Sequence, residues 1–148
     1  MLKSLPVTKQ AYIGGFLDGD GSIYVRAKPN PTYRYGFQVA PYVVLFQSQK
    51  DQEHFAEVCA LIGLGTLRIR KDGILEYVIN KIDAIKEFLE CIHPFAILKR
   101  RQIELMYQII DLKKRVENKS DFESLLKLID SYRNLNYSKK RKKRVLTP

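Results

Sequence analysis

The sequence YIGGFLDGDGSIYV, residues 12–25, decides the fold. It runs from an apolar, helix-patterned segment with two adjacent glycines, through Asp18 and Asp20, into a strand pattern. A glycine inside a helix costs about 1 kcal/mol relative to alanine, so a pair of glycines needs a compensating gain. Close approach of a second helix would supply that gain.

The first helix is expected over residues 8–18, with Thr8 as its N-terminal cap. One stripe of this helix, spaced by three and four residues, is predicted to contact the second helix, and it contains Ala11, Gly14, Gly15 and Asp18. The core-facing positions are Tyr12, Ile13, Phe16 and Leu17. If the second helix belongs to another copy of the chain related by a twofold axis, the aspartates of both copies meet. Clustered carboxylates repel one another unless divalent cations lie between them, so this arrangement predicts a metal site.

Helix and strand patterns alternate along the remaining chain. Strands are expected over residues 22–28, 36–47, 66–70 and 74–80, with helices after Ser48 and after Asn80 and two more over residues 97–114 and from Ser120. Three N-terminal caps are predicted, by Ser48 with Asp51, by Asn80 with Asp83 and by Ser120 with Glu123. Gly63 should end one helix, and Lys71-Asp72-Gly73 should form a tight turn. The order αββαββα with additional C-terminal helices predicts an α+β fold, in which helices cover one face of a four-stranded antiparallel sheet.

Side chains two positions apart on a strand point to the same face. One parity is apolar, whereas the other carries guanidinium, amide, carboxylate, phenol and small apolar groups. These groups match the donors, acceptors and thymine methyls of the DNA major groove. The alternative is an ordinary solvated sheet face, since any antiparallel sheet with one wet side shows polar residues at every second position.

Composition narrows the class of protein. The chain has 148 residues, which suit one domain, and a formal charge of +10, of which residues 139–144 supply six. We expect a domain over residues 1–137 and a basic tail over residues 138–148 that is solvated, serves in targeting or adds nonspecific affinity for phosphate. Cys59 and Cys91 lie in apolar helix patterns and are expected in the core, which suits a reduced, intracellular compartment. No apolar run is long enough to span a membrane.

Residues 13–21 resemble the nine-residue signature of the LAGLIDADG homing endonucleases, with Gly15, Asp18, Asp20 and Gly21 matching outright. The resemblance extends over residues 8–137 and is greatest to the single-motif, homodimeric branch. It includes the KPN turn at 28–30, Gln38, the Arg68-x-Arg70 pair, PFAILKRRQ at 94–102 and NLN at 134–136. An EF-hand loop beginning at Asp18 is excluded, because its twelfth position would be Pro29 rather than glutamate.

The resemblance implies a site-specific DNA endonuclease whose two subunits each place a saddle-shaped sheet in the major groove. Asp20 and the Gly19 carbonyl would bind Mg²⁺, with Mn²⁺ or Ca²⁺ able to occupy the same sites. Gln47 and Lys99 would be accessory polar residues near the scissile phosphates, and Gln49 competes with Gln47 for this role. The sequence departs from the family where a basic residue often follows the glutamine, because residues 51–53 are Asp-Gln-Glu and only Lys50 is basic nearby.

The expected partner is double-stranded DNA, read by a homodimer over a long pseudo-palindromic site. The predicted DNA-contacting residues are Tyr24, Arg26, Lys28, Asn30, Tyr33, Gln38, Ala40, Tyr42, Val44, Thr66, Arg68, Arg70, Glu76 and Val78. Two alternatives remain open: a maturase that binds intron RNA, and a DNA-binding regulator that does not cut. The resemblance does not distinguish a chloroplast, a mitochondrion or an archaeal cytoplasm.

Overall fold

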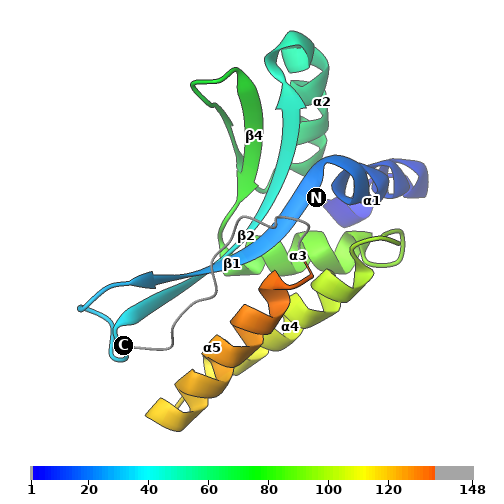
Figure 1. Ribbon diagram of the computed structural model, residues 1–148. Coiled ribbons are helices and arrows are strands. Elements are labelled where there is room, and N and C mark those ends of the chain that lie inside the picture. Colours follow the sequence, from blue (N-terminus) through cyan, green and yellow to red (C-terminus); the bar gives the residue numbers. More distant parts are fainter. Residues whose placement is uncertain (1, 136–148) are drawn as a thin grey trace. The chain divides into compact units, whose positions relative to one another are not determined.

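The computed structural model describes residues 2–135, so the predicted basic tail lies outside the described residues. Figure 1 shows the order of elements, which begins with a short 3-10 helix and alternates helices with pairs of strands. The helices are α1 (Val7–Asp20), α2 (Gln52–Ile62), α3 (Ile82–Ile92), α4 (Arg100–Arg115) and α5 (Lys119–Arg133), with 3-10 helices η1 (Leu2–Ser4) and η2 (Gln49–Asp51). The strands are β1 (Gly21–Pro29), β2 (Phe37–Ser48), β3 (Thr66–Ile69) and β4 (Ile74–Ile79).

The four strands form one sheet in the order β1-β2-β4-β3. Strand β4 is antiparallel to both of its neighbours, with Val43 opposite Ile79 on one side and Arg68 opposite Glu76 on the other. The predicted α+β class, the αββαββα order and the four-stranded antiparallel sheet are therefore confirmed. None of the helices within residues 2–135 is long and apolar enough to cross a membrane.

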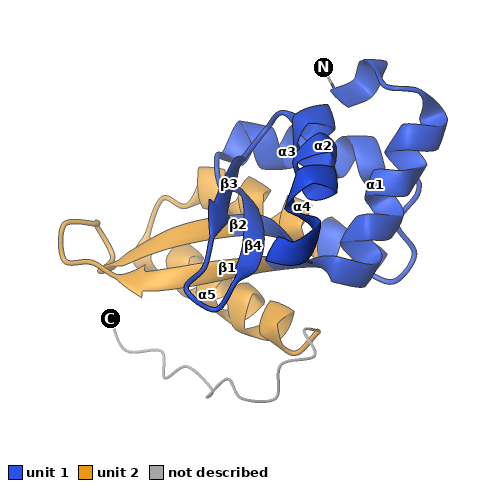
Figure 2. Cartoon of the chain, turned by 90° about the horizontal axis from the view of Figure 1, so that it is seen from above, with its two compact units in different colours: residues 1–23, 42–103 blue, residues 24–41, 104–148 orange. Residues whose placement is uncertain are grey.

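The chain divides into two compact units, coloured separately in Figure 2. Unit 1 contains Met1–Ile23 and Tyr42–Ile103, and unit 2 contains Tyr24–Pro41 and Glu104–Pro148. Strands β1 and β2 and helix α4 each pass from one unit into the other. The single domain expected from chain length stays a prediction.

Unit 1 has a core of aliphatic and aromatic side chains from α1, α2, α3 and the adjoining strand segments. The apolar residues of α2 recur every three or four positions and are buried, and the same is true of α3. The buried residues include Ile13, Leu17, Ile23, Val43, Leu45, Phe55, Val58, Cys59, Ile62, Leu75, Tyr77, Ile79, Ile85, Phe88, Leu89, Cys91 and Ile92. Both cysteines are thus core residues with free thiols, as predicted.

Unit 2 packs the β1–β2 hairpin with α5 and most of α4. Phe122 of α5 stacks on Tyr35 and Phe37, with ring centroids 5.1 and 6.4 Å apart, which fixes the helix against the hairpin. The buried residues include Val25, Ala27, Phe37, Val39, Met106, Ile109, Ile110, Phe122, Leu125, Leu126, Ile129 and Tyr132.

Several predicted helix starts were wrong. Helix α1 begins at Val7 after Pro6, which makes no side-chain cap bond, so Thr8 lies inside the helix. Pro6 has a ψ of 146°, outside the helical range, and its carbonyl accepts the first hydrogen bond of the helix, from the Gln10 N–H. Helix α4 begins at Arg100 rather than at residue 97, and the N–H groups of the three preceding residues donate to Asp18, as described below.

The predicted capping boxes also need correction. Helix α5 is capped by Asn118, whose side chain accepts a hydrogen bond from the Asp121 N–H, and Asp121 accepts one from the Glu117 N–H, so Ser120 and Glu123 form no box. Ser48 accepts from the Lys50 N–H and begins η2, so α2 starts one turn later.

The caps predicted for α2 and α3 are also wrong. Asp51 makes no side-chain cap bond at the start of α2, and α3 follows Lys81, without a side-chain cap from the predicted pair Asn80 and Asp83. The two predicted turn glycines are confirmed, since Gly63 and Gly73 both have positive φ, at 66° and 85°.

Candidate active site and nucleic-acid interface

The end of α1 is built by a turn that only glycine fits. A Cβ at Gly21 would lie 2.6 Å from a methyl of Leu17 and 2.8 Å from the Leu17 carbonyl oxygen. The chain passes directly from helix to strand at this point, which leaves Asp20 on the last turn of α1 with an exposed side chain. Gly21 therefore permits the direct turn from helix to strand that leaves the Asp20 side chain at the surface.

Asp20 has the chemistry of a divalent-cation ligand. Its carboxylate has no hydrogen-bond or ion-pair partner among residues 2–135, so both oxygens are available to a hard cation. The same described residues contain no group of three acidic, histidine or cysteine side chains close enough to hold a metal. Asp20 is therefore the one acidic ligand that the predicted metal site would take from the described part of a single chain.

Asp18, two residues earlier, is fully engaged by protein donors. Its Oδ2 accepts hydrogen bonds from the N–H groups of Ile97 (2.7 Å) and Leu98 (3.0 Å), and its Oδ1 accepts one from the Lys99 N–H (3.1 Å). The Lys99 Nζ donates to the backbone oxygen of Asp18 at 3.1 Å. The structure therefore brings Lys99 to the same helix end as Asp20.

Lys99 is 9% exposed and precedes α4, so it does not belong to a solvated basic helix face. The two candidate glutamines differ in surroundings. Gln47 is half-buried near the end of β2, opposite Leu75, and its Oε1 accepts from the Ser48 N–H at 2.9 Å. Gln49 is exposed in η2, and its side-chain oxygen lies beside Gly73 in the β3–β4 turn. Both glutamines lie at the end of β2 and the start of η2, so the choice between them stays a prediction.

The predicted helix–helix stripe on α1 was partly wrong. Gly14 is buried against α3 and the loop that follows it in the same chain, and a Cβ there would lie 2.9 Å from the Phe95 Cβ. Gly15 and Gly19 have nothing within 4 Å of an added Cβ, and Ala11 is exposed, so these three leave a strip of small residues open.

Large apolar side chains in unit 1 are also exposed, and sequence reasoning missed them. Tyr12, which was expected in the core, is 54% exposed, and Ile97 and Leu98 are 75% and 66% exposed. Tyr12 lies beside Phe16, which in turn stacks on buried Phe55. Because the amides of Ile97 and Leu98 bind Asp18, both side chains stand next to the end of α1. Exposed apolar groups gathered in this way indicate an interaction surface.

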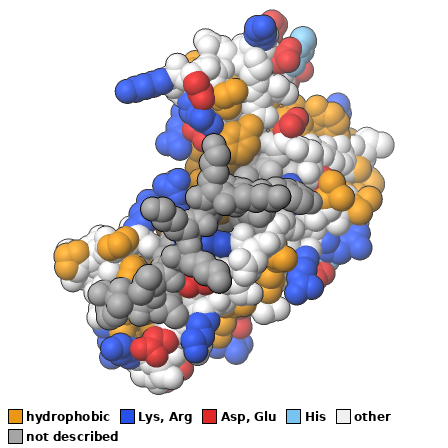
Figure 3. Space-filling view, viewed as in Figure 1, with side chains coloured by type: hydrophobic (Ala, Val, Ile, Leu, Met, Phe, Trp, Pro, Cys, Tyr) orange, Lys and Arg blue, Asp and Glu red, His pale blue; other side chains and the backbone are white. Residues whose placement is uncertain are grey.

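The β3–β4 hairpin carries the predicted arginine pair on its exposed side. Arg68 Nε lies 3.6 Å from Oε1 of the cross-strand residue Glu76, and Arg70 is held at 2.7 Å by Asp72 in the turn. Figure 3 shows basic side chains gathered over this turn. Exposed ion pairs of this kind contribute little to stability, but they orient the guanidinium groups. Thr66 is exposed on the same hairpin, as predicted, and Ile69, at an apolar position of β3, is also exposed.

Tyr77 fixes the entry to this hairpin, and sequence reasoning did not identify it. Its buried hydroxyl accepts hydrogen bonds from the N–H groups of Leu64 (2.8 Å) and Gly65 (2.6 Å). Burial raises the pKa of the Tyr77 hydroxyl. The one available signal was its position at the apolar parity of β4, where a phenol needs a polar partner.

Two predicted DNA contacts are contradicted by burial. Val44 and Val78 lie opposite each other on β2 and β4 and are 0% and 7% exposed, so their methyl groups face protein rather than solvent. Tyr42, on the same face of β2, is half-buried.

In unit 2 the predicted contacts lie on the β1–β2 hairpin. The Arg26 guanidinium lies 5.5 Å from the centre of the Tyr24 ring, and Lys28, Gln38 and Ala40 are half-buried. Asn30 has a structural role as well, because its Oδ1 accepts from the N–H and the hydroxyl of Thr32 and thereby forms the hairpin turn.

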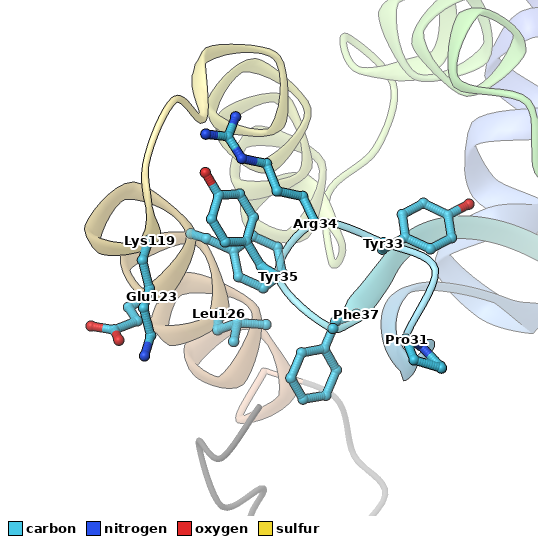
Figure 4. A pocket seen from close by; sticks show the side chains of 10 residues that line it. Pro31, Tyr33, Arg34, Tyr35, Phe37, Lys119, Glu123 and Leu126 are labelled. Atoms are coloured by element: carbon cyan, nitrogen blue, oxygen red, sulfur yellow. The ribbon is translucent and has the colours of Figure 1, made fainter.

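Unit 2 also contains a cavity of about 390 Å³ between the hairpin tip and α5. Figure 4 shows Tyr35 and Phe37 directed into it and Tyr33 pointing away toward the outside. Its walls are mainly aromatic and aliphatic, with Lys119 and Glu123 at the side of α5. The cavity therefore resembles an incompletely filled packing interface, and Tyr33 remains available at the hairpin tip.

Comparison with known proteins gives consistent results. Residues 13–106 match the family model described as LAGLIDADG endonuclease. The chain is 32% identical over 132 residues to the DNA endonuclease I-CreI of Chlamydomonas reinhardtii, covering 88% of this chain and 80% of that one. It is also 32% identical to the DNA endonuclease I-CvuI of Chlorella vulgaris, with 90% and 83% covered. A crystal structure of I-CvuI in complex with the I-CreI target superposes with a TM-score of 0.84 at 30% identity, covering 91% of this chain and 86% of that one.

Proposed function

The chain belongs to the LAGLIDADG endonuclease family, and from that premise we propose that it is a homing endonuclease that cuts both strands of a long DNA site as a homodimer. The observation that carries the proposal is the end of α1, where buried Lys99 donates to the Asp18 carbonyl and the exposed Asp20 carboxylate has no partner among residues 2–135. The relatives support the reaction class, since I-CreI and I-CvuI are both named as DNA endonucleases.

Dimer formation is supported by the surface around α1. The open strip at Ala11, Gly15 and Gly19 lets another helix approach closely, and two large side chains of the same unit are exposed, Tyr12 on α1 and Ile97, whose N–H binds Asp18. A twofold axis along this strip brings two copies of Asp20 together. That arrangement supplies the acidic oxygens that one chain lacks for a metal site.

The donor set suits a hard divalent cation. The exposed Asp20 carboxylate and the Gly19 carbonyl would hold Mg²⁺, and Mn²⁺ or Ca²⁺ would fit the same oxygen ligands. When bound, such an ion would promote ionisation of a coordinated water and stabilise charge on the leaving oxygen. The Lys99 ammonium places a positive charge at the helix end, where phosphate oxygens would approach. Gln47 would orient polar groups at the rim of the site.

DNA reading is assigned to the exposed side of the strands. Arg68 and Arg70 are two residues apart and held by acidic partners, an arrangement that suits bidentate contacts with guanine, each worth about 1–3 kcal/mol of discrimination. Glu76 would act mainly by orienting Arg68. Tyr24, Arg26, Lys28, Asn30, Tyr33, Gln38, Ala40, Tyr42 and Thr66 remain proposed contacts.

The test uses a plasmid that carries the joined flanks of the host intron, incubated with Mg²⁺. The proposal expects a linear product from the natural chain, whereas Asp20→Asn should yield none while binding the site in Ca²⁺ within a few-fold of the natural affinity. Asp83→Asn, at an exposed position on α3, is the matched control and should cut normally. Binding without cutting by the natural chain would favour a non-cleaving DNA-binding protein, and equal loss of binding and cutting in Asp20→Asn would contradict the assigned role.

A further inference from the structure

The carboxylate of Asp18 joins two segments that are 79–81 residues apart in the chain. It accepts from three successive backbone N–H groups, those of Ile97, Leu98 and Lys99, immediately before α4. These three N–H groups lie outside the helices and strands, and the Asp18 carboxylate is the acceptor for all of them. Asp18 therefore ties the segment that leads into α4 to the end of α1.

The backbone of Asp18 holds the side chain of Lys99. The carbonyl of Asp18 is among the last four of α1, which lack intrahelical donors, and the Lys99 Nζ donates to it at 3.1 Å. A cation at this end is further favoured by the helix dipole. Asp18 thus binds Lys99 twice. Its carboxylate accepts from the Lys99 backbone N–H, and its carbonyl accepts from the Lys99 ammonium.

These bonds leave Asp18 little capacity for a metal. Its two oxygens already receive three N–H groups, whereas the Asp20 carboxylate receives none from residues 2–135. The two aspartates of the signature consequently have separate tasks.

We propose that Asp18 is a positioning residue for DNA cutting, which holds the Lys99 ammonium at the end of α1 beside Asp20. The inference rests on the proposed endonuclease function. Without the carboxylate, three N–H groups lose their acceptor, the segment before α4 shifts, and the ammonium moves from its place. A displacement of 1 Å at a reacting centre can cost about 100-fold in rate.

The test is a double-mutant cycle on the single-turnover cutting rate with saturating Mg²⁺. Asp18→Asn retains the size of the side chain but places an amide against N–H donors, and it should slow cutting about 10- to 100-fold. Lys99→Met removes the ammonium. If Asp18 acts through Lys99, adding Asp18→Asn to Lys99→Met should slow cutting less than about twofold further.

Three further measurements separate positioning from a general structural effect. Site affinity in Ca²⁺ and the dimer dissociation constant should stay within a few-fold of the natural values for Asp18→Asn. Asp18→Glu, which keeps the charge, should restore part of the rate, and it replaces Asp18→Asn in the cycle if the latter does not fold. The control Asp83→Asn should leave the cutting rate unchanged, both in the natural chain and in Lys99→Met.

Multiplicative effects of the two substitutions would overturn the inference, as would parallel loss of binding, dimerisation and cutting in Asp18→Asn. A natural rate in Asp18→Asn, from a preparation in which the unaltered chain cuts, would overturn this inference alone. Absence of cutting by the unaltered chain would instead refute the proposed function.

Discussion

Gly14 and Gly15 are neighbours on α1 with different surroundings, and replacing each by alanine tests them separately. An added methyl at Gly14 would lie 2.9 Å from the Phe95 Cβ, whereas one at Gly15 would meet nothing within 4 Å in the single chain. Both substitutions gain about 1 kcal/mol of helix propensity. The difference between them therefore isolates the contact with Phe95.

Overfilling a packed site by one methyl costs about 1–3 kcal/mol. Since the propensity gain cancels, we expect the unfolding free energy of the Gly15→Ala monomer to exceed that of Gly14→Ala by about 1–3 kcal/mol. The effects on dimerisation should have the opposite order, because in the proposed dimer a twofold axis places the two methyls added by Gly15→Ala in the interface. Two such methyls cost about 2–6 kcal/mol per dimer, which weakens dimerisation by about 30-fold or more.

Urea unfolding at high dilution, followed by circular dichroism because the chain has no tryptophan, gives the monomer stabilities. Sedimentation over a dilution series gives the dimer dissociation constants. Equal monomer stabilities would refute the assignment of Gly14 to intramolecular packing. An unchanged dimer constant in Gly15→Ala would refute the assignment of Gly15 to the dimer surface.

Three further outcomes are expected. Asn118→Ala should lower stability by about 1 kcal/mol in thermal unfolding, whereas Ser120→Ala should change it little, because only Asn118 caps α5; the reverse order would restore the capping box predicted from sequence. Tyr77→Phe leaves two amides without an acceptor and should lower the free energy of unfolding by about 1–3 kcal/mol. It should also reduce discrimination between DNA targets in a cutting assay with target variants. A neutral effect would contradict the anchoring role of Tyr77. Burial raises the pKa of the Cys59 thiol from 9.0 to about 11, so the folded chain holds this proton more tightly than the unfolded chain. The contribution of this thiol to the free energy of unfolding should be complete below pH 9 and fall as pH rises toward 11. Cys59→Ala should make that fall smaller in urea titrations.

Helices and strands in which apolar residues recur at a regular spacing could be predicted from the sequence. The stripes of α2 and α3, the turn at Gly73 and the alternation along β1 and β2 all follow from local burial requirements, which the order of residues encodes directly. The resemblance in residues 13–21 then supplied the candidate role of Asp20 and the resemblance in residues 94–102 that of Lys99, and the structure brings Lys99 to the end of α1, where Asp20 lies.

The errors occurred where a distant segment decides local structure. The three N–H groups before α4 donate to Asp18, about 80 residues earlier, and no local pattern reports this contact. Gly14 and Gly15 are equivalent in sequence, but only the position of Phe95 shows which of them is buried. Val44 was predicted to contact DNA because it alternates with polar residues on one face of β2, but it is fully buried in the structure.

The central claim is that two copies of α1 meet and that each contributes one Asp20 to a double-strand cut. It is tested most directly by mixing unaltered chains with Asp20→Asn chains at constant total concentration, allowing the subunits to exchange, and measuring linear product. Random pairing predicts that double-strand cutting follows the square of the unaltered fraction, so an equal mixture retains about one quarter of the activity. A linear decline to about one half would mean that each chain cuts alone, and would contradict the shared site.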